Sequence, residues 1–357
     1  MKILVTGNMG YIGPSVIRQL RTSYPEAGIA GLDAGYFAHC LSADDVLPEC
    51  RVDVQYFNDV RAVEKEMLRG IDAIIHLAGI SNDPMGNKFE EMTLDINHRA
   101  SITLAKNGKT AGVKAFVFAS SCSIYGSADD QARTENAPLN PLTAYARSKV
   151  FTERDLKPLA DEDFKVTCLR FSTACGMSER LRLDLVLNDF VAGAIASKRI
   201  TILSDGSPWR PLINVKDMAR AIDWAISRDT KEGGEFLAVN VGSNEWNYQV
   251  KDLAEAVATV IPSVDVSVNK DGQPDKRSYR VSFDLFRGLA PHHQPKVDLV
   301  TTIKELEHGL KVMGFNDEDF RNSKFIRLKV LTQLRNRGLL TEKLVWADRQ
   351  KQGRVVV

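Results

Sequence analysis

Short apolar runs alternate with amphipathic stretches through the first half of the chain. The runs are bounded by glycine or polar residues, as buried strands are, and lie at residues 3–5, 28–33, 52–57, 73–77, 115–119 and 165–170. Between them, stretches such as 60–68 and 96–107 carry apolar residues at helical spacing. This alternation predicts βαβ units and a parallel sheet, in which functional sites lie at the carboxyl ends of the strands.

Beyond residue 170 the pattern is looser and predicts a second unit. We expect a strand over 200–203, a turn-rich segment over 262–280, a frayed tail over 348–357, and helices over 180–196, 215–228, 300–310 and 326–334. The fold class is therefore α/β, a doubly wound parallel sheet of Rossmann type with a second, smaller α/β lobe. We assign the sheet domain to 1–175 plus 208–240, the lobe to 176–207 plus 241–330, and a C-terminal helix and tail to 331–357.

The composition is that of an ordinary globular protein, with 44% hydrophobic and 26% charged residues in a chain of 357. Lys and Arg total 47 against 46 Asp and Glu, so the net charge of +1 gives no reason to expect a nucleic acid or an anionic membrane as partner. No apolar run approaches the roughly 18 residues of a membrane span, and the N-terminus lacks a signal-peptide pattern. Five cysteines without a C-x-x-C pair favour neither a disulfide framework nor a zinc site, so we expect no metal and a reducing cytoplasm.

A glycine-rich turn, Gly7-Asn8-Met9-Gly10-Tyr11-Ile12-Gly13, joins the first predicted strand to the first helix. Glycines permit a tight turn and the close approach of a pyrophosphate, while the helix N-terminus offers unpaired N–H groups. The spacing differs by one residue from the usual dinucleotide fingerprint. Asp33 ends the second strand, 20 residues past Gly13, where a carboxylate binds ribose hydroxyls and repels a 2′-phosphate. We therefore predict a dinucleotide site that favours NAD over NADP.

Two further strand ends complete the predicted cofactor site. Asp59 and Val60 follow the third strand, and Asp59 either meets the adenine edge or caps a helix that begins at Val60. The fourth strand ends in a run with small residues, which lets a cofactor approach at Leu77, Ala78 and Gly79. His76 precedes them among apolar neighbours, and we interpret it as structural.

Tyr145 and Lys149 stand four residues apart, and Ser121 ends an apolar run 24 residues before Tyr145. On a helix, residues four apart share a face, so the ammonium would lie beside the phenol. A free Tyr has a pKa of about 10, and an adjacent cation favours the phenolate. The pattern predicts that Tyr145 is an acid/base group; taken by itself it also recurs by chance on exposed helices.

These motifs, in this order, resemble the extended short-chain dehydrogenase/reductases, and more narrowly their NAD-dependent nucleotide-sugar epimerase/dehydratase group. The resemblance covers about residues 1–315. It implies a domain that holds NAD, a lobe that holds a nucleoside-diphosphate sugar, and a homodimer by analogy with relatives. By position, Ser121 matches the family's catalytic Ser/Thr, Tyr145 its base, Lys149 the group that binds the nicotinamide ribose, and Asn97 a supporting helix asparagine.

The same resemblance implies the substrate contacts. Arg210 lies in a segment whose arginine meets the sugar diphosphate in relatives, and Arg277, preferred over Arg280, lies in a second one. Planar guanidinium groups suit phosphate oxygens. The other predicted substrate contacts are Ser81, Cys122, Ser123 and Asn188. Arg180 and Arg182 lie near the expected sugar-nucleotide loop without an assigned role, and Ser172-Thr173-Ala174 stands where relatives often carry an Asn.

Cys122 and Ser123 decide which reaction we predict. Family 4,6-dehydratases carry an Asp-Glu pair at these two positions and decarboxylases carry Glu at the second, so both reactions are disfavoured. Cys122 either carries a second proton or is a buried, inert thiol, and we favour the inert thiol. We predict an NAD-dependent epimerase that oxidises a sugar hydroxyl, at C4, transiently. A sugar dehydrogenase or 4-ketoreductase is the alternative, and a non-catalytic NAD-binding regulatory protein stays open.

Overall fold

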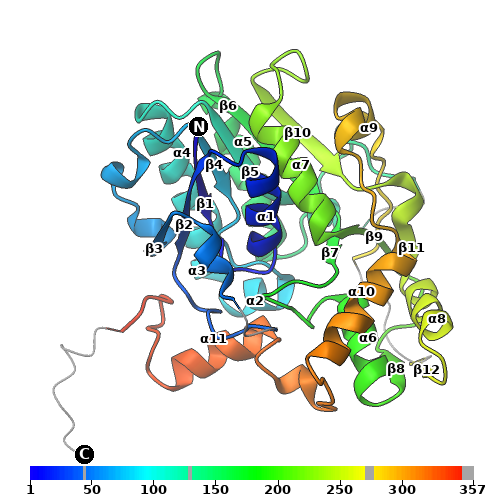
Figure 1. Cartoon of the computed structure of the whole chain (residues 1–357). Coiled ribbons are helices and arrows are strands. Elements are labelled where there is room, and N and C mark those ends of the chain that lie inside the picture. The colour runs from blue at the N-terminus through cyan, green and yellow to red at the C-terminus, as the bar shows by residue number, and fades with distance from the viewer. Residues whose placement is uncertain (43–45, 128–130, 270–276, 348–357) are drawn as a thin grey trace, which may run out of the picture.

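A computed structural model describes residues 1–42, 46–127, 131–269 and 277–347. Its centre is a seven-stranded parallel sheet in the order β10-β6-β5-β4-β1-β2-β3 (Figure 1). The strands are β1 (Lys2–Thr6), β2 (Gly28–Asp33), β3 (Val54–Phe57), β4 (Ala73–His76), β5 (Ala115–Ser121), β6 (Lys165–Phe171) and β10 (Phe236–Val241). The order reverses direction between β1 and β4, which confirms the predicted doubly wound fold and creates a crevice at their carboxyl ends.

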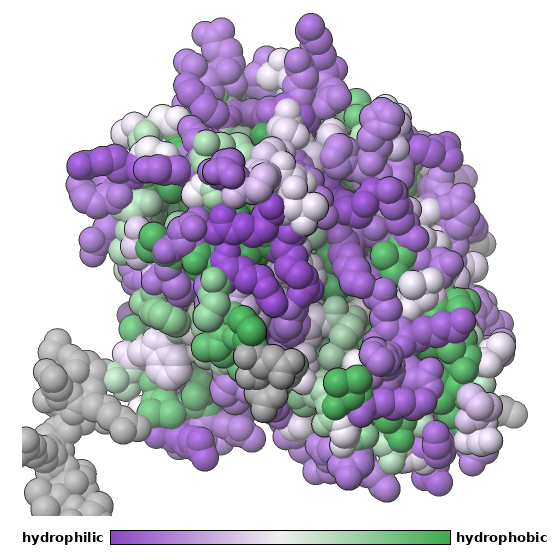
Figure 2. Space-filling view, in the orientation of Figure 1, coloured by the Kyte–Doolittle hydropathy of each residue, from purple (hydrophilic) through white to green (hydrophobic). Residues whose placement is uncertain are grey.

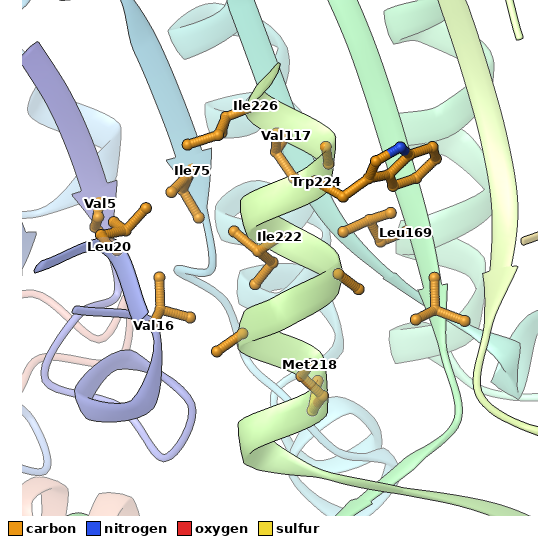
Figure 3. Packing of buried hydrophobic residues seen from close by; sticks show 14 of the residues in the cluster. Val5, Val16, Leu20, Ile75, Val117, Leu169, Met218, Ile222, Trp224 and Ile226 are labelled. Atoms are coloured by element: carbon orange, nitrogen blue, oxygen red, sulfur yellow. The ribbon is translucent and has the colours of Figure 1, made fainter. Parts of the chain in front are cut away.

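Both faces of this sheet are covered, because alternate residues of each strand point to opposite sides. Val5 of β1 lies in the core under α1 (Gly13–Ser23) and α7 (Val215–Ser227), whose apolar faces meet the sheet in Figure 3. Leu4 lies in the opposite core, with residues of α4 (Ala100–Thr110) and α5 (Ala144–Leu156). The sheet is therefore buried on both faces by the described helices.

The second lobe is built from two small sheets and the helices that pack on them. One sheet has the order β11-β9-β7 and the other pairs β12 with β8. The elements are β7 (Thr173–Cys175), β8 (Arg199–Ile202), β9 (Trp209–Asn214), β11 (Asn247–Gln249), β12 (Asp265–Val268), α6 (Val186–Ala196), α8 (Val250–Val260) and α10 (Leu299–Val312). Strands β7 and β9 fall inside the ranges expected for the sheet domain, yet they pair with each other away from the large sheet. The chain therefore leaves the central sheet at Phe171 and returns to it at α7.

Three predicted elements differ from the structure. The expected helix over 60–68 is two 3₁₀ turns, Val60–Ala62 and Lys65–Leu68, because Val63 and Glu64 between them are extended. The helix expected over 180–196 begins only at Val186, since the preceding arginines are held by carboxylates elsewhere in the loop and in the sheet domain. The stretch over 96–107 starts with a π-helical turn, Asp95–Arg99, before α4. Strand β10 was not anticipated at all.

The C-terminal segment, residues 327–347, begins with α11 (Arg327–Asn336) and lies along the carboxyl edge of the sheet domain (Figure 1). Leu331, Leu340 and Leu344 are buried in the same core as Leu4. Short helices α2 (Asp83–Lys88), α3 (Glu90–Leu94) and α9 (Asp284–Leu289) complete the chain. Residues 348–357, expected to fray, and 270–276 of the turn-rich segment lie outside the described residues.

The face seen in Figure 2 is mostly hydrophilic, with hydrophobic residues gathered in patches over its lower part. None of the helices in the described ranges is both long and apolar enough to cross a lipid bilayer.

Candidate active site

A cavity of about 830 Å³ runs along the carboxyl ends of the central strands and under the second lobe. Most of the residues predicted from the sequence line it: Gly7, Gly10, Tyr11, Ile12, Asp33, Asp59, Val60, Leu77, Ala78, Gly79, Ser81, Ser121, Ser123, Tyr145, Lys149, Arg210 and Arg277. Three predicted residues lie behind its wall: Gly13, Cys122 and Asn188. One continuous space thus brings the predicted cofactor, catalytic and diphosphate groups together.

The glycine turn is packed so tightly that side chains do not fit. Gly7 has φ of +73°, and a Cβ there would lie 2.5 Å from the backbone nitrogen of Ala78. A Cβ on Gly13 would lie 1.9 Å from the carbonyl oxygen of Asn8, so Gly13 shapes the turn from behind rather than facing the cavity. The N-terminus of α1 therefore opens directly onto the cavity, which fits the pyrophosphate of a dinucleotide.

Asp33 is held at the end of β2 by two backbone donors, the N–H groups of Met9 at 3.1 Å and Gly35 at 2.8 Å. Burial raises the pKa of its carboxyl group, and the two hydrogen bonds oppose that shift. The carboxylate keeps further lone pairs for ribose hydroxyls. The residues at this end of the cavity accordingly suit the adenosine half of NAD.

Asp59 has two local partners. Its side chain caps the Val60–Ala62 turn by accepting from the Arg61 N–H at 2.8 Å, and it pairs with the Arg61 guanidinium at 2.6 Å. Arg61 also reaches Asp95 at 3.3 Å. The capping alternative foreseen for Asp59 is present, and both Asp59 and Val60 still face the cavity.

Helix α5 carries Tyr145 and Lys149 toward the end of β5. Thr143 caps the helix by accepting from the Ala146 N–H at 3.1 Å, which fixes its first turn. Nζ of Lys149 lies 5.5 Å from the centre of the Tyr145 ring and donates to the carbonyl oxygen of Ala119 at 2.6 Å. The neighbouring Ser121 hydroxyl acts to lower the pKa of Tyr145. The i, i+4 spacing places Tyr145 and Lys149 on one face of α5, and these two residues and Ser121 all line the cavity.

The pKa of Tyr145 differs from the sequence-based expectation. Burial raises it to about 12, against the smaller lowering by the hydrogen bond to Ser121, and Asp83 raises it further. Burial also lowers the pKa of Lys149 to about 8, while the negative charge of Glu153 opposes that shift. The net pKa of Tyr145 is therefore above its usual value in the protein alone, because the effect of burial is larger than that of any neighbouring charge or hydrogen bond.

Asn97 and Glu153 support this triad from behind. The π-helical turn aims Asn97 at the loop after β4, where it accepts from the Ile80 N–H at 2.7 Å and donates to the Ile80 carbonyl at 2.9 Å. Its amide also donates to Ser148 at 3.1 Å. Glu153 pairs with Arg170 at 2.7 Å, and both side chains are buried. Such π turns often mark functional sites, and here the turn ties the loop to α5.

His76 is a buried structural histidine, as interpreted from the sequence. Its Nδ1 lies 2.6 Å from the Thr6 hydroxyl and its Nε2 lies 2.7 Å from the Ser101 hydroxyl. Burial lowers its pKa to about 3, so the ring is neutral.

Cys122 and Ser123 follow Ser121 but face different surroundings. Sγ of Cys122 donates to the carbonyl oxygen of Arg170 at 3.1 Å, and burial raises the pKa of this thiol. A buried thiol with a raised pKa is typical of an unreactive cysteine. Oγ of Ser123 is buried, lines the cavity and has no hydrogen-bond partner among the described residues. An unpaired buried hydroxyl at a cavity wall is suited to a polar ligand.

The opposite wall carries arginines from several segments. Arg210 of β9 donates to the carbonyl oxygen of Arg277, so the two predicted diphosphate residues are neighbours. Arg277 also reaches across to Asp83 of the sheet domain at 2.5 Å. Arg182 pairs with Asp184 at 2.8 Å and donates to Ser81 at 3.0 Å. This wall would attract an anionic ligand such as a diphosphate.

Asn188 does not reach the cavity. Its amide donates to the Tyr11 hydroxyl at 3.0 Å, and its oxygen accepts from the Gly176 N–H at 3.0 Å. Asn188 thereby joins the glycine turn to the second lobe. Sequence reasoning missed other lining residues, among them Asp83, Arg321 and Arg327, because no local motif marks them.

Comparisons with known proteins agree with this geometry. The model of the NAD dependent epimerase/dehydratase family matches residues 3–242. The chain is 26% identical to a UDP-glucose 4-epimerase of Lactobacillus helveticus over 338 residues, which are 89% of this chain and 100% of that protein.

Two solved structures show the same fold. A UDP-glucuronic acid 4-epimerase from Bacillus cereus, in complex with UDP-glucuronic acid and NAD, has a TM-score of 0.75 at 21% identity, covering 88% of this chain and 100% of that one. An NAD dependent NDP-hexosamine 5,6-dehydratase of tunicamycin biosynthesis has a TM-score of 0.75 at 23% identity, covering 89% and 99%.

Proposed function

Because the chain belongs to the NAD dependent epimerase/dehydratase family, we propose that it is a nucleotide-sugar 4-epimerase. It is an NAD-dependent enzyme of the extended short-chain dehydrogenase/reductase type. The finer proposal is that it inverts C4 of a nucleoside-diphosphate sugar through transient oxidation of the C4 hydroxyl. NAD is then restored within each turnover.

One observation carries this proposal. Ser121, Tyr145 and Lys149 stand together on a cavity whose one end is the glycine turn and whose far wall holds Arg210 and Arg277. A proton-transfer group, a dinucleotide site and a diphosphate site are therefore within one space. That combination fits oxidation of a sugar hydroxyl better than it fits a purely regulatory NAD-binding protein, which needs no such triad.

In the proposed reaction the phenolate of Tyr145 takes the proton of the C4 hydroxyl while Ser121 orients that hydroxyl by a hydrogen bond. Bound NAD supplies the hydride acceptor and donor and, when oxidised, a positive charge that favours the phenolate. The charged ammonium group of Lys149 also favours the phenolate form of Tyr145. After rotation of the ketosugar, Tyr145 returns the proton and C4 has the opposite configuration.

Binding of the sugar nucleotide would rest on the opposite wall. Arg210 and Arg277 present guanidinium groups to the diphosphate, and the hydroxyl of Ser123 is placed to bind the sugar. Ser81 is held at the cavity by Arg182. Asn188 is left out of the substrate contacts, because its side chain is already bonded to Tyr11 and Gly176 behind the cavity wall.

The environment of Cys122 and Ser123 favours epimerisation over elimination of water. A 4,6-elimination needs an acid and a base beyond the tyrosine. The thiol of Cys122 is buried with a raised pKa, and Ser123 offers a neutral hydroxyl. Inversion at C4 needs only the shared oxidation and reduction, for which the triad suffices.

The test is incubation of the purified enzyme with UDP-glucose, UDP-galactose and other nucleotide sugars in heavy water. The expected product is the C4 epimer, formed without net NADH and without solvent deuterium on carbon, because the same hydride leaves and returns. Accumulation of NADH indicates a dehydrogenase instead. Deuterium at C5 or C6, or loss of water, indicates a dehydratase and overturns the proposal.

Two broader expectations belong to the same proposal. We propose a homodimer and a cytoplasmic location, the first by analogy with relatives and the second because five cysteines without C-x-x-C pairing suit a reducing compartment. Light scattering on the purified chain gives its mass in solution, and a monomer at working concentrations contradicts the dimer.

A further inference from the structure

Arg327, the first residue of α11, is an arginine at the cavity wall that no motif predicted. Its side chain is almost fully buried, with 1% of the residue exposed. One terminal nitrogen donates to the carbonyl oxygen of Arg180 at 2.7 Å, and the other lies 3.5 Å from that of Lys324. Its guanidinium stands 4.8 Å from the centre of the Phe37 ring. Phe37 belongs to the loop that leaves β2 just after Asp33.

The guanidinium of Arg327 has no carboxylate partner among the described residues, unlike its neighbours. Arg180 pairs with Glu49 at 2.8 Å and Arg182 with Asp184 at 2.8 Å. Burial lowers the pKa of Arg327 to about 10, and the positive charges of Arg182 and Arg180 act in the same direction. A buried cation without an anion is costly, and a ligand anion relieves that cost.

Arg228 shows what a purely structural arginine looks like in this protein. It is equally buried, and burial lowers its pKa to about 10 as well. Its guanidinium, however, donates to Thr167 and to carbonyl oxygens of Val166, Glu232, Gly234 and Glu235. These acceptors use its donors within the protein, away from the cavity. Within the described part of the chain Arg327 has two acceptors, and it lines the cavity, so it has donors for a ligand.

Contacts of the C-terminal segment with the ends of β2 and β3 fix the position of Arg327. Trp346 donates to the carbonyl oxygen of Ala34 at 2.6 Å, and Arg61 donates to that of Lys343 at 2.8 Å. Leu340 and Leu344 are buried in the sheet domain. The segment lies beyond residue 242, where the family match ends. Its anchors therefore fix the arginine relative to the adenosine end of the cavity.

We propose that Arg327 binds a ligand diphosphate, and that this diphosphate is the one of NAD. A guanidinium suits phosphate oxygens, and the contact with Phe37 places this one beside the loop that follows Asp33. The inference rests on NAD as cofactor and does not require that the reaction is an epimerisation. The C-terminal segment thus contributes a residue to the cofactor site.

The test compares Arg327→Gln with a control on the same helix, Lys329→Gln, whose side chain is exposed. Calorimetric titration of the cofactor-free protein with NAD, ADP, adenosine and UDP separates the contributions. We expect Arg327→Gln to weaken NAD and ADP by about 10- to 100-fold, the usual size of a hydrogen bond to a charged group. Adenosine, which has no phosphate, and UDP, which stands for the sugar nucleotide, should bind as to the unchanged protein. Lys329→Gln should match the unchanged protein for all four.

Two results would overturn the inference. If Arg327→Gln binds ADP as tightly as the unchanged protein does, Arg327 does not contact the NAD diphosphate. If the variant loses affinity for UDP alone, Arg327 binds the sugar nucleotide instead. If the glutamine variant does not fold, Arg327→Lys keeps a charge but loses the planar fork. In that variant we expect ADP to raise the thermal midpoint less than in the unchanged protein while adenosine raises it equally; an equal ADP shift contradicts the proposal. None of these readouts depends on turnover.

Discussion

The ionisable residues at the two ends of the cavity differ in whether their charges are paired. At the reaction end, Tyr145 and Lys149 are buried with pKa values displaced toward their neutral forms, to about 12 and about 8. At the adenosine end, Arg61 is matched to Asp59 and Asp95 and bonds to the C-terminal segment. Tyr145 and Lys149 are therefore uncompensated where chemistry is expected, whereas Arg61 is paired with carboxylates, and Arg327 is the exception among the arginines at the adenosine end.

This difference separates groups that serve function from groups that serve stability. Removing a displaced group at the reaction end should harm turnover and leave stability the same or higher. Removing a paired group at the adenosine end should lower stability first. Four substitutions test the contrast, in decreasing order of expected effect.

The largest effect is expected for Tyr145→Phe. Loss of the acid/base hydroxyl should lower the rate about 10²- to 10⁴-fold, while NAD affinity and the unfolding midpoint stay close to those of the unchanged protein. Tyr56→Phe on the edge strand β3 is the control, because Tyr56 lies outside the cavity lining. A mutant with normal turnover of every nucleotide sugar would remove Tyr145 from the mechanism.

Lys149→Met is expected to stabilise the cofactor-free protein at pH 7 while it lowers turnover less than Tyr145→Phe does. The pKa of Lys149 falls from 10.5 to about 8 on folding, so keeping it protonated costs about 3 kcal/mol below pH 8. As pH rises from 8 to 10.5 both states lose the proton and the cost disappears. The advantage of the mutant should therefore shrink to nothing near pH 10.5.

Urea unfolding at pH 7 and pH 10 measures this difference, with Lys106→Met on the exposed face of α4 as control. A mutant that is less stable than the unchanged protein at pH 7 contradicts the contrast between the two ends.

Arg61→Leu should lower stability by about 1–3 kcal/mol, because it removes the guanidinium partner of Asp59 and a bond to the C-terminal segment. The control is Arg69→Leu, whose pair with Glu66 is exposed, with 81% and 73% of the side chains accessible, and should change stability by less than about 0.5 kcal/mol. Chemical denaturation of both variants gives the comparison. Equal stabilities would show that the pairs at the adenosine end contribute nothing.

The smallest effect is expected for Asp83→Asn. The charge of Asp83 raises the pKa of Tyr145, so its removal should lower that pKa and move the acidic limb of the kcat/KM profile to lower pH, by less than about one unit. The exposed Glu91→Gln is the control. A shift to higher pH would show that another charge governs the tyrosine.

The sequence predicts the parts of this site that lie within short stretches of chain. The glycine turn, Asp33 and the Tyr145–Lys149 spacing were all found, because a turn, a strand end and a helix face are set by neighbours in sequence. Most strands of the central sheet were found for the same reason.

Features that depend on distant contacts were missed. The rise in the pKa of Tyr145 comes from burial by other elements, which no local pattern records. Arg327 reaches the cavity only because the C-terminal segment folds back on β2. The stretch over 60–68 has helical spacing, yet Val63 and Glu64 are extended in the folded chain. In each case tertiary contacts outweigh local preference.

The pair between Arg277 and Asp83 spans the cavity from one wall to the other. A diphosphate that binds Arg277 exchanges one anion for another instead of neutralising a solvated cation. Dissolved salt weakens attraction between separated charges but changes little when partners are swapped at short range. The affinity for the sugar nucleotide should therefore depend less on ionic strength than the number of arginines in the wall suggests. Asp83 competes with the diphosphate for Arg277.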